Sequence, residues 1–433
     1  MGKRSKELFI CGLTFVITFL FCAIVLLISV SAVKSENIKE NIYQSGKYWE
    51  PFKPVYQWLP GNYKLSIDYF SDPILFNIMY YEDSSHPLSS MLKDEYYDAV
   101  VDGEYKSSAM LLDAIENDLA PNAEYSRYWH GSTAFLRPLL LLLTCKGIYI
   151  LNGFMLLLML ALVFTYLIKN DYKDLAFSLG IGLVFSNSFM AFTCIEFTTM
   201  HMLCLLALLV ELWLISKNAS ESAFLAFFVS LGVVTNFLDF LTTETLPYLT
   251  CLVAYYAIKY KKETLKDFSK EMVFMIKSFF GFGLSYGLMW AMKWILTTAV
   301  TDVNAFTQAA SHSAKWTLEV GESLNLPRQI IMALGRNLGS LFPFSFMPLS
   351  LNWLSVVLVL GLLCFIFLYR KSGKNFDFGR LLLIICFVPI IRFIVLSNHS
   401  YLHFTMTHRA LLPSVMAMFL ILKLQLISKS RKK

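Results

Sequence analysis

LFICGLTFVITFLFCAIVLLISVSAV, residues 8–33, is the stretch that decides the fold class. It holds twenty-six residues without a charge, and a helix of that length rises far enough to cross a hydrocarbon core roughly 30 Å thick. Lys3, Arg4 and Lys6 precede it, as they would in a secretory signal. The apolar run is nevertheless longer than the roughly 7 to 15 residues of a signal peptide. We therefore predict a membrane-spanning helix that the chain retains.

The rest of the chain continues this pattern. Of its 433 residues, 56% are hydrophobic and only 16% are charged, which is too little charge to cover a soluble globule of this size. The sequence thus predicts an all-α polytopic membrane protein with about ten transmembrane helices. After the span at 8–33, the further apolar segments lie near 147–168, 175–195, 199–216, 222–241, 245–258, 272–299, 350–369, 381–397 and 410–428.

Three regions follow from this division. Residues 1–33 form the first span with its basic N-terminus. Residues 34–146 form a large polar loop with amphipathic helices and a short return to the membrane at 135–144. Residues 147–433 form a membrane bundle of about nine helices.

Lysines and arginines set the orientation. They cluster in alternate connections, such as 259–270 and 370–380, whereas the connections at 196–198, 242–244 and 398–409 contain only Arg409. The positive-inside rule then places both termini in the cytoplasm of a multi-pass protein of the cell membrane, here a bacterial cytoplasmic membrane. The loop at 34–146 lies outside. The net charge of +6 does not indicate nucleic acid, because the basic residues sit between apolar segments.

Acidic residues of the outer loop are the first candidates for chemistry. Asp68 and Asp72, in IDYFSD, would share one face of a helix, and either could act as a general base on an acceptor hydroxyl. The alternative is that they cap a helix or are solvated. Glu82 and Asp83 are candidates for substrate binding, whereas Asp94 is expected on a solvated acidic face.

Aromatic and basic residues precede the next membrane entry. Arg127, Tyr128, Trp129 and His130 stand directly before it, and Arg137 lies inside the apolar run. Tyrosine and tryptophan at this depth also serve as ordinary interfacial anchors. The guanidinium of Arg137 suits a phosphate or diphosphate headgroup, although snorkelling or a structural ion pair would explain it as well.

Two further stretches carry polar groups at the outer ends of spans. NFLDFLTTETLPY holds Asp239 and Glu244, which suggest acceptor binding or simply a capped hairpin. His408 and Arg409, with Arg392 in the preceding span, suggest a phosphate-binding patch. The spacing of His399, His403 and His408 mixes helix faces, so no metal site is predicted.

The order of these features resembles the GT-C fold of polyprenyl-phosphate-sugar glycosyltransferases. The resemblance rests on IDYFSD, RYWHGSTAFLRPLL, FLDFLTTETLP and THRALLP, which are similar to stretches of largely uncharacterised Gram-positive bacterial membrane proteins of that superfamily. It implies that an acidic residue of the first outer loop activates the acceptor, a role that carries over to Asp68 or Asp72. The sequence departs from the family in lacking an adjacent acidic pair soon after the first span.

We therefore expect an outward-facing glycosyltransferase that moves a sugar from a polyprenyl-phosphate donor to a cell-surface glycan. Its partners would be that donor, the glycan acceptor and the lipid bilayer, and not nucleic acid. No resident cofactor is predicted, and a divalent cation is left open. A glycan polymerase or ligase that relies on arginines is one alternative, and a transporter or flippase for a lipid-linked saccharide is another. Glu211, Lys277 and Lys293 favour the latter, whereas the lack of an internal repeat disfavours it.

Overall fold

The computed structural model describes residues 2–58, 65–317, 325–341 and 374–430. Within these ranges, seven helices are long and apolar enough to cross a membrane. The protein is therefore a helical, multi-pass membrane protein. The seven candidate spans are Ser5–Ala32, Cys145–Lys169, Ile195–Ser216, Glu221–Leu238, Phe268–Val300, Phe376–Val395 and Phe404–Leu424.

The predicted count of about ten spans is not confirmed. The expected span at 350–369 lies outside the described residues. The expected span at 175–195 consists of a 13-residue helix, α8 (Lys173–Phe185), followed by a separate 3-10 helix. The expected span at 245–258 is a 16-residue helix, α11 (Leu246–Lys261). Both helices are shorter than the roughly 20 residues that a single crossing needs.

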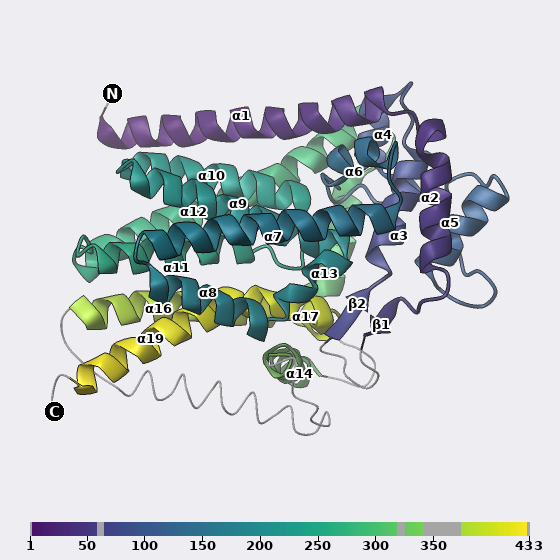
Figure 1. The fold of residues 1–433 in the computed structure, drawn as a ribbon. Helices are drawn as coiled ribbons and strands as arrows, with labels where there is room; N and C mark the ends of the chain where they lie inside the picture. The colour runs from purple at the N-terminus through teal and green to yellow at the C-terminus, as the bar shows by residue number, and fades with distance from the viewer. Residues whose placement is uncertain (1, 59–64, 318–324, 342–373, 431–433) are drawn as a thin grey trace.

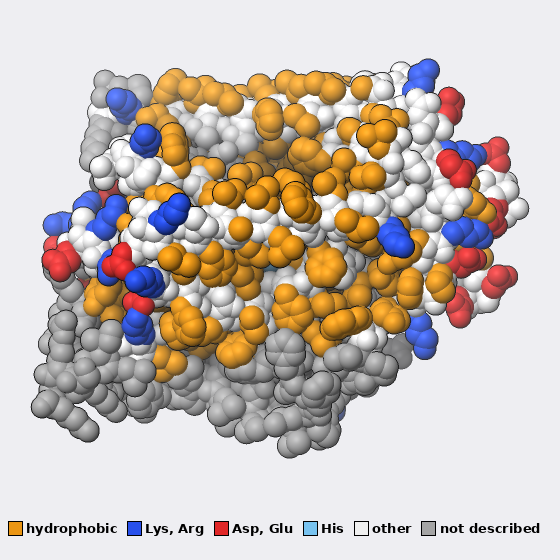
Figure 2. Space-filling model, viewed as in Figure 1, with side chains coloured by type: hydrophobic (Ala, Val, Ile, Leu, Met, Phe, Trp, Pro, Cys, Tyr) orange, Lys and Arg blue, Asp and Glu red, His pale blue; other side chains and the backbone are white. Residues whose placement is uncertain are grey.

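The long helices lie side by side in one bundle (Figure 1). Both described ends of the chain lie at the same end of the bundle. Apolar side chains cover the middle of the surface, and charged side chains gather at its two ends (Figure 2). The helices of the bundle are α1 (Lys3–Ala32), α7 (Cys145–Lys169), α8, η2 (Ser188–Thr193), α9 (Ile195–Ser216), α10 (Glu221–Leu238), α11, α12 (Phe268–Val300), α16 (Lys374–Val395) and α19 (Leu412–Ser430).

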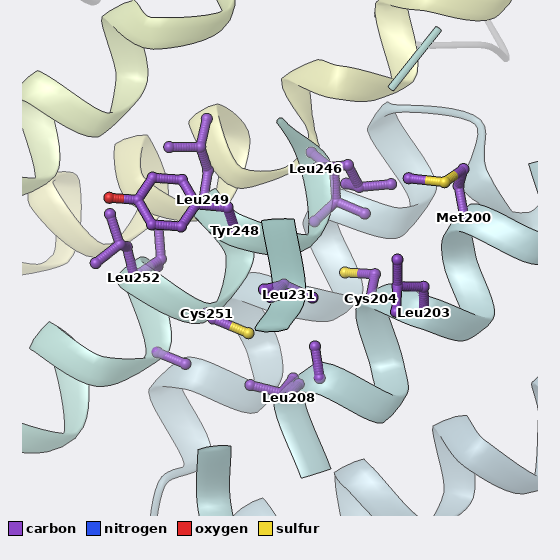
Figure 3. Packing of buried hydrophobic residues seen from close by; sticks show 14 of the residues in the cluster. Met200, Leu203, Cys204, Leu208, Leu231, Leu246, Tyr248, Leu249, Cys251 and Leu252 are labelled. Atoms are coloured by element: carbon purple, nitrogen blue, oxygen red, sulfur yellow. The ribbon is translucent and has the colours of Figure 1, made fainter. Parts of the chain in front are cut away.

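Small residues allow close packing inside the bundle. A Cβ atom on Gly232 of α10 would lie 2.2 Å from the Ser285 side-chain oxygen and 2.3 Å from the Phe282 carbonyl, both on α12. Only glycine therefore fits at this crossing. Leucine, methionine, tyrosine and cysteine side chains fill the interior between α9, α10 and α11 (Figure 3). The bundle thus has a continuous apolar core of its own.

Most of the polar stretch after α1 folds into a cap at the end of the bundle away from the termini (Figure 1). An apolar cluster around Trp49 and Phe76 packs the cap against the first residues of α7 and α9. Two antiparallel strand pairs join its parts, with Val55 opposite Asp68 and Glu95 opposite Glu124. Its elements are α2 (Ser35–Trp49), β1 (Val55–Gln57), β2 (Ser66–Asp68), α3 (Ser71–Tyr81), α4 (Pro87–Lys93), β3 (Glu95–Tyr96), α5 (Ser107–Glu116) and β4 (Ala123–Glu124).

Short helices complete the end of the bundle that carries the cap. The run 135–144 does not cross the membrane, as expected, because its helix α6 spans only Thr133–Leu140. The other short helices are α13 (Ala305–Thr317), α14 (Leu326–Gly339), α17 (Ser397–Leu402), α18 (Phe404–Thr407) and η4 (His408–Leu411).

Two buried ion pairs connect the cap to the bundle. Arg137 of α6 contacts Glu82, just after α3, at 2.6 Å, and Lys293 of α12 contacts Asp94, just after α4, at 2.7 Å. All four side chains are at most 2% exposed. The expectation that Asp94 lies on a solvated face is therefore wrong. Burial raises the pKa of Asp94, and the nearby Lys293 ammonium opposes that rise.

Candidate functional site

A cleft of about 370 Å³ opens between α12, α13 and α16, at the end of the bundle that carries the cap. Most of its wall is apolar and aromatic, and two arginines line it. We call it the arginine cleft. Its lining residues are Arg127, Tyr128, Leu241, Thr245, Phe279, Trp290, Trp294, Ala309, His312, Ser313, Trp316, Thr317, Val388, Ile391, Arg392, Val395 and Leu396.

Four buried polar atoms of this lining have no hydrogen-bond partner within the described residues. They are Arg127 Nε, Thr245 Oγ1, Trp290 Nε1 and His312 Nδ1. The arginine and tryptophan nitrogens are donors only, and the hydroxyl and the imidazole nitrogen can also donate. A buried polar group without a partner costs about 1–3 kcal/mol. The cleft is therefore suited to a ligand that brings several acceptor oxygens.

Aromatic rings hold Arg127 at the cleft. Its guanidinium lies 3.9 Å from the ring centre of Tyr125 and 5.4 Å from that of Tyr128. The Trp294 indole donates to the Arg127 carbonyl at 3.2 Å. Tyr128 in turn packs against Trp290, with ring centres 6.0 Å apart. These contacts orient the guanidinium through ring faces, and its buried Nε keeps no hydrogen-bond partner among the described residues.

Arg392 of α16 lines the cleft from another side and is tied to the α10–α11 loop. Its Nε donates to Glu244 Oε1 at 2.8 Å, its Nη2 donates to the Leu241 carbonyl at 2.6 Å and its Nη1 donates to Ser400 Oγ at 2.9 Å. The Glu244 side chain is 12% exposed. The structure thus brings two predicted site residues, Arg392 and Glu244, together at the cleft.

Asp239 lies behind this pair, at the end of α10. Its carboxylate accepts bonds from the backbone amides of Leu241 and Thr243, at 2.8 and 3.2 Å, and from the Tyr286 hydroxyl at 3.4 Å. Burial and the neighbouring Glu244 raise its pKa, and Arg392 opposes the rise. The capped-hairpin interpretation describes these contacts, yet Asp239 also shares the electrostatic environment of the cleft.

Asp68 and Asp72, the predicted catalytic carboxylates, are both buried and do not belong to the cleft lining. They do not share a helix, since Asp68 ends β2 and Asp72 lies in α3. Asp68 Oδ1 accepts from the Phe70 amide at 2.7 Å, and Asp68 Oδ2 accepts from Ser71 Oγ at 2.5 Å. This is the helix-capping arrangement that was the alternative for IDYFSD.

Asp72 joins the cap to α9. It accepts from the Ile195 amide at 2.9 Å and from the Tyr149 hydroxyl at 2.6 Å. Burial raises the pKa of Asp72 to about 7, although the Tyr149 and Ile195 bonds favour its charged form. Burial also raises the pKa of Asp68, against the Ser71 bond and the more distant charge of Arg409.

Neither Arg409 nor His408 belongs to the lining of the arginine cleft, and Arg409 is near enough to Asp68 for its charge to affect that carboxylate. Arg409 is fully buried, with its guanidinium 4.0 Å from the Phe197 ring centre and Nη1 donating to the Thr405 carbonyl at 2.6 Å. Its Nε and Nη2 lack a hydrogen-bond partner in the part of the chain that the structure describes. His408 Nδ1 lies 2.9 Å from the Phe404 carbonyl.

Arg137, for which a phosphate contact was predicted, lies in a buried ion pair. Its guanidinium is fully buried, pairs with Glu82 and also donates to the carbonyls of Met79, at 2.7 Å, and Val33. The structural ion pair, one of the two alternatives, describes this site. Glu82 is the partner of that pair, and the substrate-binding role predicted for Glu82 stays a prediction.

Three further residues predicted to bind substrate, Asp83, Trp129 and His130, lie outside the lining of the arginine cleft and have contacts within the protein. Asp83 is exposed and accepts from the Ser85 amide at 2.8 Å, which caps a loop away from the cleft. Trp129 is fully buried, and its indole donates to the Met289 carbonyl at 2.9 Å. His130 adopts a φ of +49° and contacts the Tyr125 carbonyl at 3.2 Å. Burial lowers its pKa well below the usual value, so the imidazole is neutral near pH 7.

The described ranges contain no group of three or more His, Cys, Asp or Glu residues that could hold a metal ion. His399 and His403 instead pack against Trp316, with ring centres 5.0 and 5.4 Å away. The use of a divalent cation, which the sequence left open, is not tested by these contacts.

The arginine cleft contains residues that sequence reasoning missed, notably Thr245, Trp290, Trp294 and His312. The tryptophans have helical spacing near the end of a span, a pattern that also fits interfacial anchoring. Nothing in the sequence shows that these tryptophans of α12 meet α13 and Arg392 at one cleft, because α16, which carries Arg392, is far from both helices along the chain.

The fold and this cleft define a multi-pass helical membrane protein with a mixed apolar and cationic site at the capped end of its bundle. Comparison with known proteins found no matching family model, no matching curated protein and no matching solved structure.

Proposed function

We propose that the protein is a membrane glycosyltransferase that takes its sugar from a polyprenyl-phosphate donor and passes it to a cell-surface glycan on the outer face of the membrane. The observation that supports this most is the arginine cleft. It combines an aromatic and apolar wall with Arg127, Arg392 and unpaired donors, which suits a lipid that ends in a phosphate. Its volume of about 370 Å³ would accommodate a headgroup and the first part of a chain.

The proposed reaction is a displacement at the anomeric carbon. An acceptor hydroxyl forms the new bond to this carbon, and the bond between carbon and phosphate oxygen breaks. The lipid phosphate leaves with the electron pair, and its charge is held by Arg127 and Arg392. The hydroxyl proton passes to a carboxylate.

Glu244 is the first carboxylate to test as this base. It is bonded to Arg392 of the cleft and is partly exposed, whereas Asp68 and Asp72 are engaged in internal hydrogen bonds. Asp68 and Asp72 remain candidates from the resemblance to GT-C enzymes. They would need to reach the acceptor from a position outside the cleft lining.

A glycan polymerase or ligase is the second candidate. It would use arginines as its main tools, and two arginines line the cleft, whereas none of the lining residues that the structure describes is acidic. Neutral substitution of Glu244, Asp68 and Asp72 would leave such an enzyme active, whereas substitution of Arg127 would inactivate it.

The test uses the full chain reconstituted in lipid nanodiscs. Radiolabelled polyprenyl-phosphate sugars are supplied with cell-wall glycan, with and without Mg²⁺ or Mn²⁺. Transfer of label to glycan by the wild type, and its loss in Arg127→Gln, is the expected result. Label that stays on the lipid for every sugar and metal condition would overturn the proposal.

A further inference from the structure

A second concave site lies on the cap, away from the arginine cleft. It is a groove of about 480 Å³ formed by two segments of the cap, 51–54 and 104–106. The first segment joins α2 to β1, and the second leads into α5. We call it the cap groove. Lys106 Nζ donates to the Glu50 carbonyl and so links the two segments.

The lining of the cap groove mixes ring faces with charges. Tyr105 is 55% exposed, and Phe52 and two prolines provide further apolar surface. Lys53 and Glu104 are exposed beside them. The lining of the arginine cleft differs, because most of its wall is apolar and aromatic. A lipid chain would not satisfy both kinds of lining group.

The aromatic residues of the groove are held in place. The Phe52 ring centre lies 4.9 Å from that of Tyr69 and 5.1 Å from that of Tyr56. The Tyr105 ring centre lies 5.8 Å from that of Phe70. A fixed aromatic surface loses little conformational entropy when it binds a ligand. An exposed tyrosine on such a support is a better binding element than one on a free loop.

The groove adjoins Asp68. The Tyr69 amide donates to the Pro54 carbonyl at 2.8 Å, and Val55 pairs directly with Asp68 across the two strands. Phe70, which supports Tyr105, donates its amide to Asp68. A ligand in the groove therefore lies next to the strand that carries this carboxylate.

We propose that the cap groove binds a carbohydrate chain. Sugar rings have one face rich in C–H groups, which carry partial positive charge and match the negative face of an aromatic ring. Their hydroxyls both donate and accept, which matches Lys53 and Glu104 together. The identification of the bound chain as the acceptor glycan rests on the proposed function, whereas the proposal that the groove binds carbohydrate is independent of it.

Binding is tested on the full chain in nanodiscs without any lipid donor. The probes are chitohexaose, maltohexaose and dextran, with decaproline as a peptide rival, and binding is followed by saturation-transfer NMR and calorimetry. We expect the wild type to bind at least one saccharide. Tyr105→Ala and Lys53→Ala should each weaken that binding at least tenfold, whereas Leu88→Ala, which removes an exposed apolar side chain outside the groove lining, should not.

Three results would overturn the carbohydrate site: no saccharide binds, the Tyr105 and Lys53 variants bind like the wild type, or decaproline alone binds. An unchanged thermal unfolding midpoint in Tyr105→Ala excludes misfolding as the cause of lost binding. Saccharide binding by a protein that transfers no label from any polyprenyl-phosphate sugar would reject the proposed function and leave the groove in place. Transfer of label to glycan by a protein whose cap groove binds no saccharide would reject the groove site and leave the proposed function in place.

Discussion

Replacing Arg137 by methionine removes one partner of a fully buried ion pair and leaves the other in place. The Arg137 guanidinium lies 2.6 Å from Glu82, and both side chains are at most 2% exposed. The same guanidinium donates to the Met79 and Val33 carbonyls. The substitution therefore leaves a carboxylate and two carbonyls without these donors, at the point where α6 meets the ends of α1 and α3.

The size of the effect follows from these contacts. Breaking a buried pair by removing one partner costs about 3–5 kcal/mol. Burial already raises the pKa of Glu82, and loss of Arg137 would raise it further, so protonation of Glu82 limits the cost. We expect a loss of about 4 kcal/mol at neutral pH and a smaller loss at low pH. Substituting both partners by methionine should cost less than Arg137→Met alone, because no buried charge is left.

The assay is equilibrium unfolding of the reconstituted protein in mixed micelles with increasing SDS, followed by tryptophan fluorescence. Lys146→Met is the matched control, because Lys146 is exposed on the neighbouring helix α7. We expect that control to stay within about 0.5 kcal/mol of the wild type.

Binding of a polyprenyl-phosphate donor is measured in parallel on the same variants. If Arg137→Met loses less than about 1 kcal/mol of stability and binds the donor at least tenfold more weakly, Arg137 is a ligand-binding residue and our assignment fails. Equal losses in the single and the double variant would also refute the argument, since the remaining carboxylate would then carry no cost.

Four other predictions follow from single contacts. Lys293→Met strands Asp94 in the interior and should lower the free energy of unfolding by about 3–5 kcal/mol in the same SDS titration. Gly232→Ala should cost at least about 1–3 kcal/mol there, because its Cβ would lie 2.3 Å from the Phe282 carbonyl of α12. Arg127→Gln should weaken donor binding at least tenfold in nanodisc binding measurements, with an unfolding midpoint close to that of the wild type. Burial raises the pKa of Asp72 from 3.8 to about 7, so the folded state binds more protons between these values. Its contribution to stability is fully present below about pH 4 and is lost as the pH rises to about 7, and Asp72→Asn should flatten the decline between these two values.

The membrane class was predictable because it depends on local composition alone. The run 8–33 lies within α1 except for its last residue, Val33, which is the C-cap, and the apolar segment at 147–168 lies within α7. The span at 175–195 was wrong as a single helix, because hydropathy cannot show that the chain leaves the helix after Phe185. There, Asn187 adopts a φ of +60° and the 3-10 helix η2 begins.

The roles of charged residues were far less predictable. Arg137 and Glu82 are separated by 55 residues, and Lys293 and Asp94 by 199, so no sequence pattern links either pair. Asp94 occupies a left-handed C-cap position of α4, which turns its carboxylate toward α12 and away from the expected solvated face. The pairing of Arg392 with Glu244 was within reach, because both residues were already placed at the same end of neighbouring spans.

Arg137, Arg127 and Arg409 at the capped end of the bundle differ in whether a carboxylate faces the guanidinium, and this difference argues for where a ligand binds. Arg137 has a carboxylate and backbone carbonyls around it, so its charge is neutralised within the protein. Arg127 and Arg409 have aromatic rings beside the guanidinium instead of a carboxylate. Each retains a buried N–H group without a partner among the residues that the structure describes, as does Arg137 at its Nε. A protein gains no stability from keeping such donors unpaired, because each costs about 1–3 kcal/mol. Their retention is understandable if an anion or ordered water completes them. Of the two, only Arg127 lines a cleft of about 370 Å³, so the phosphate of a lipid donor is better sought there than at the fully buried Arg409.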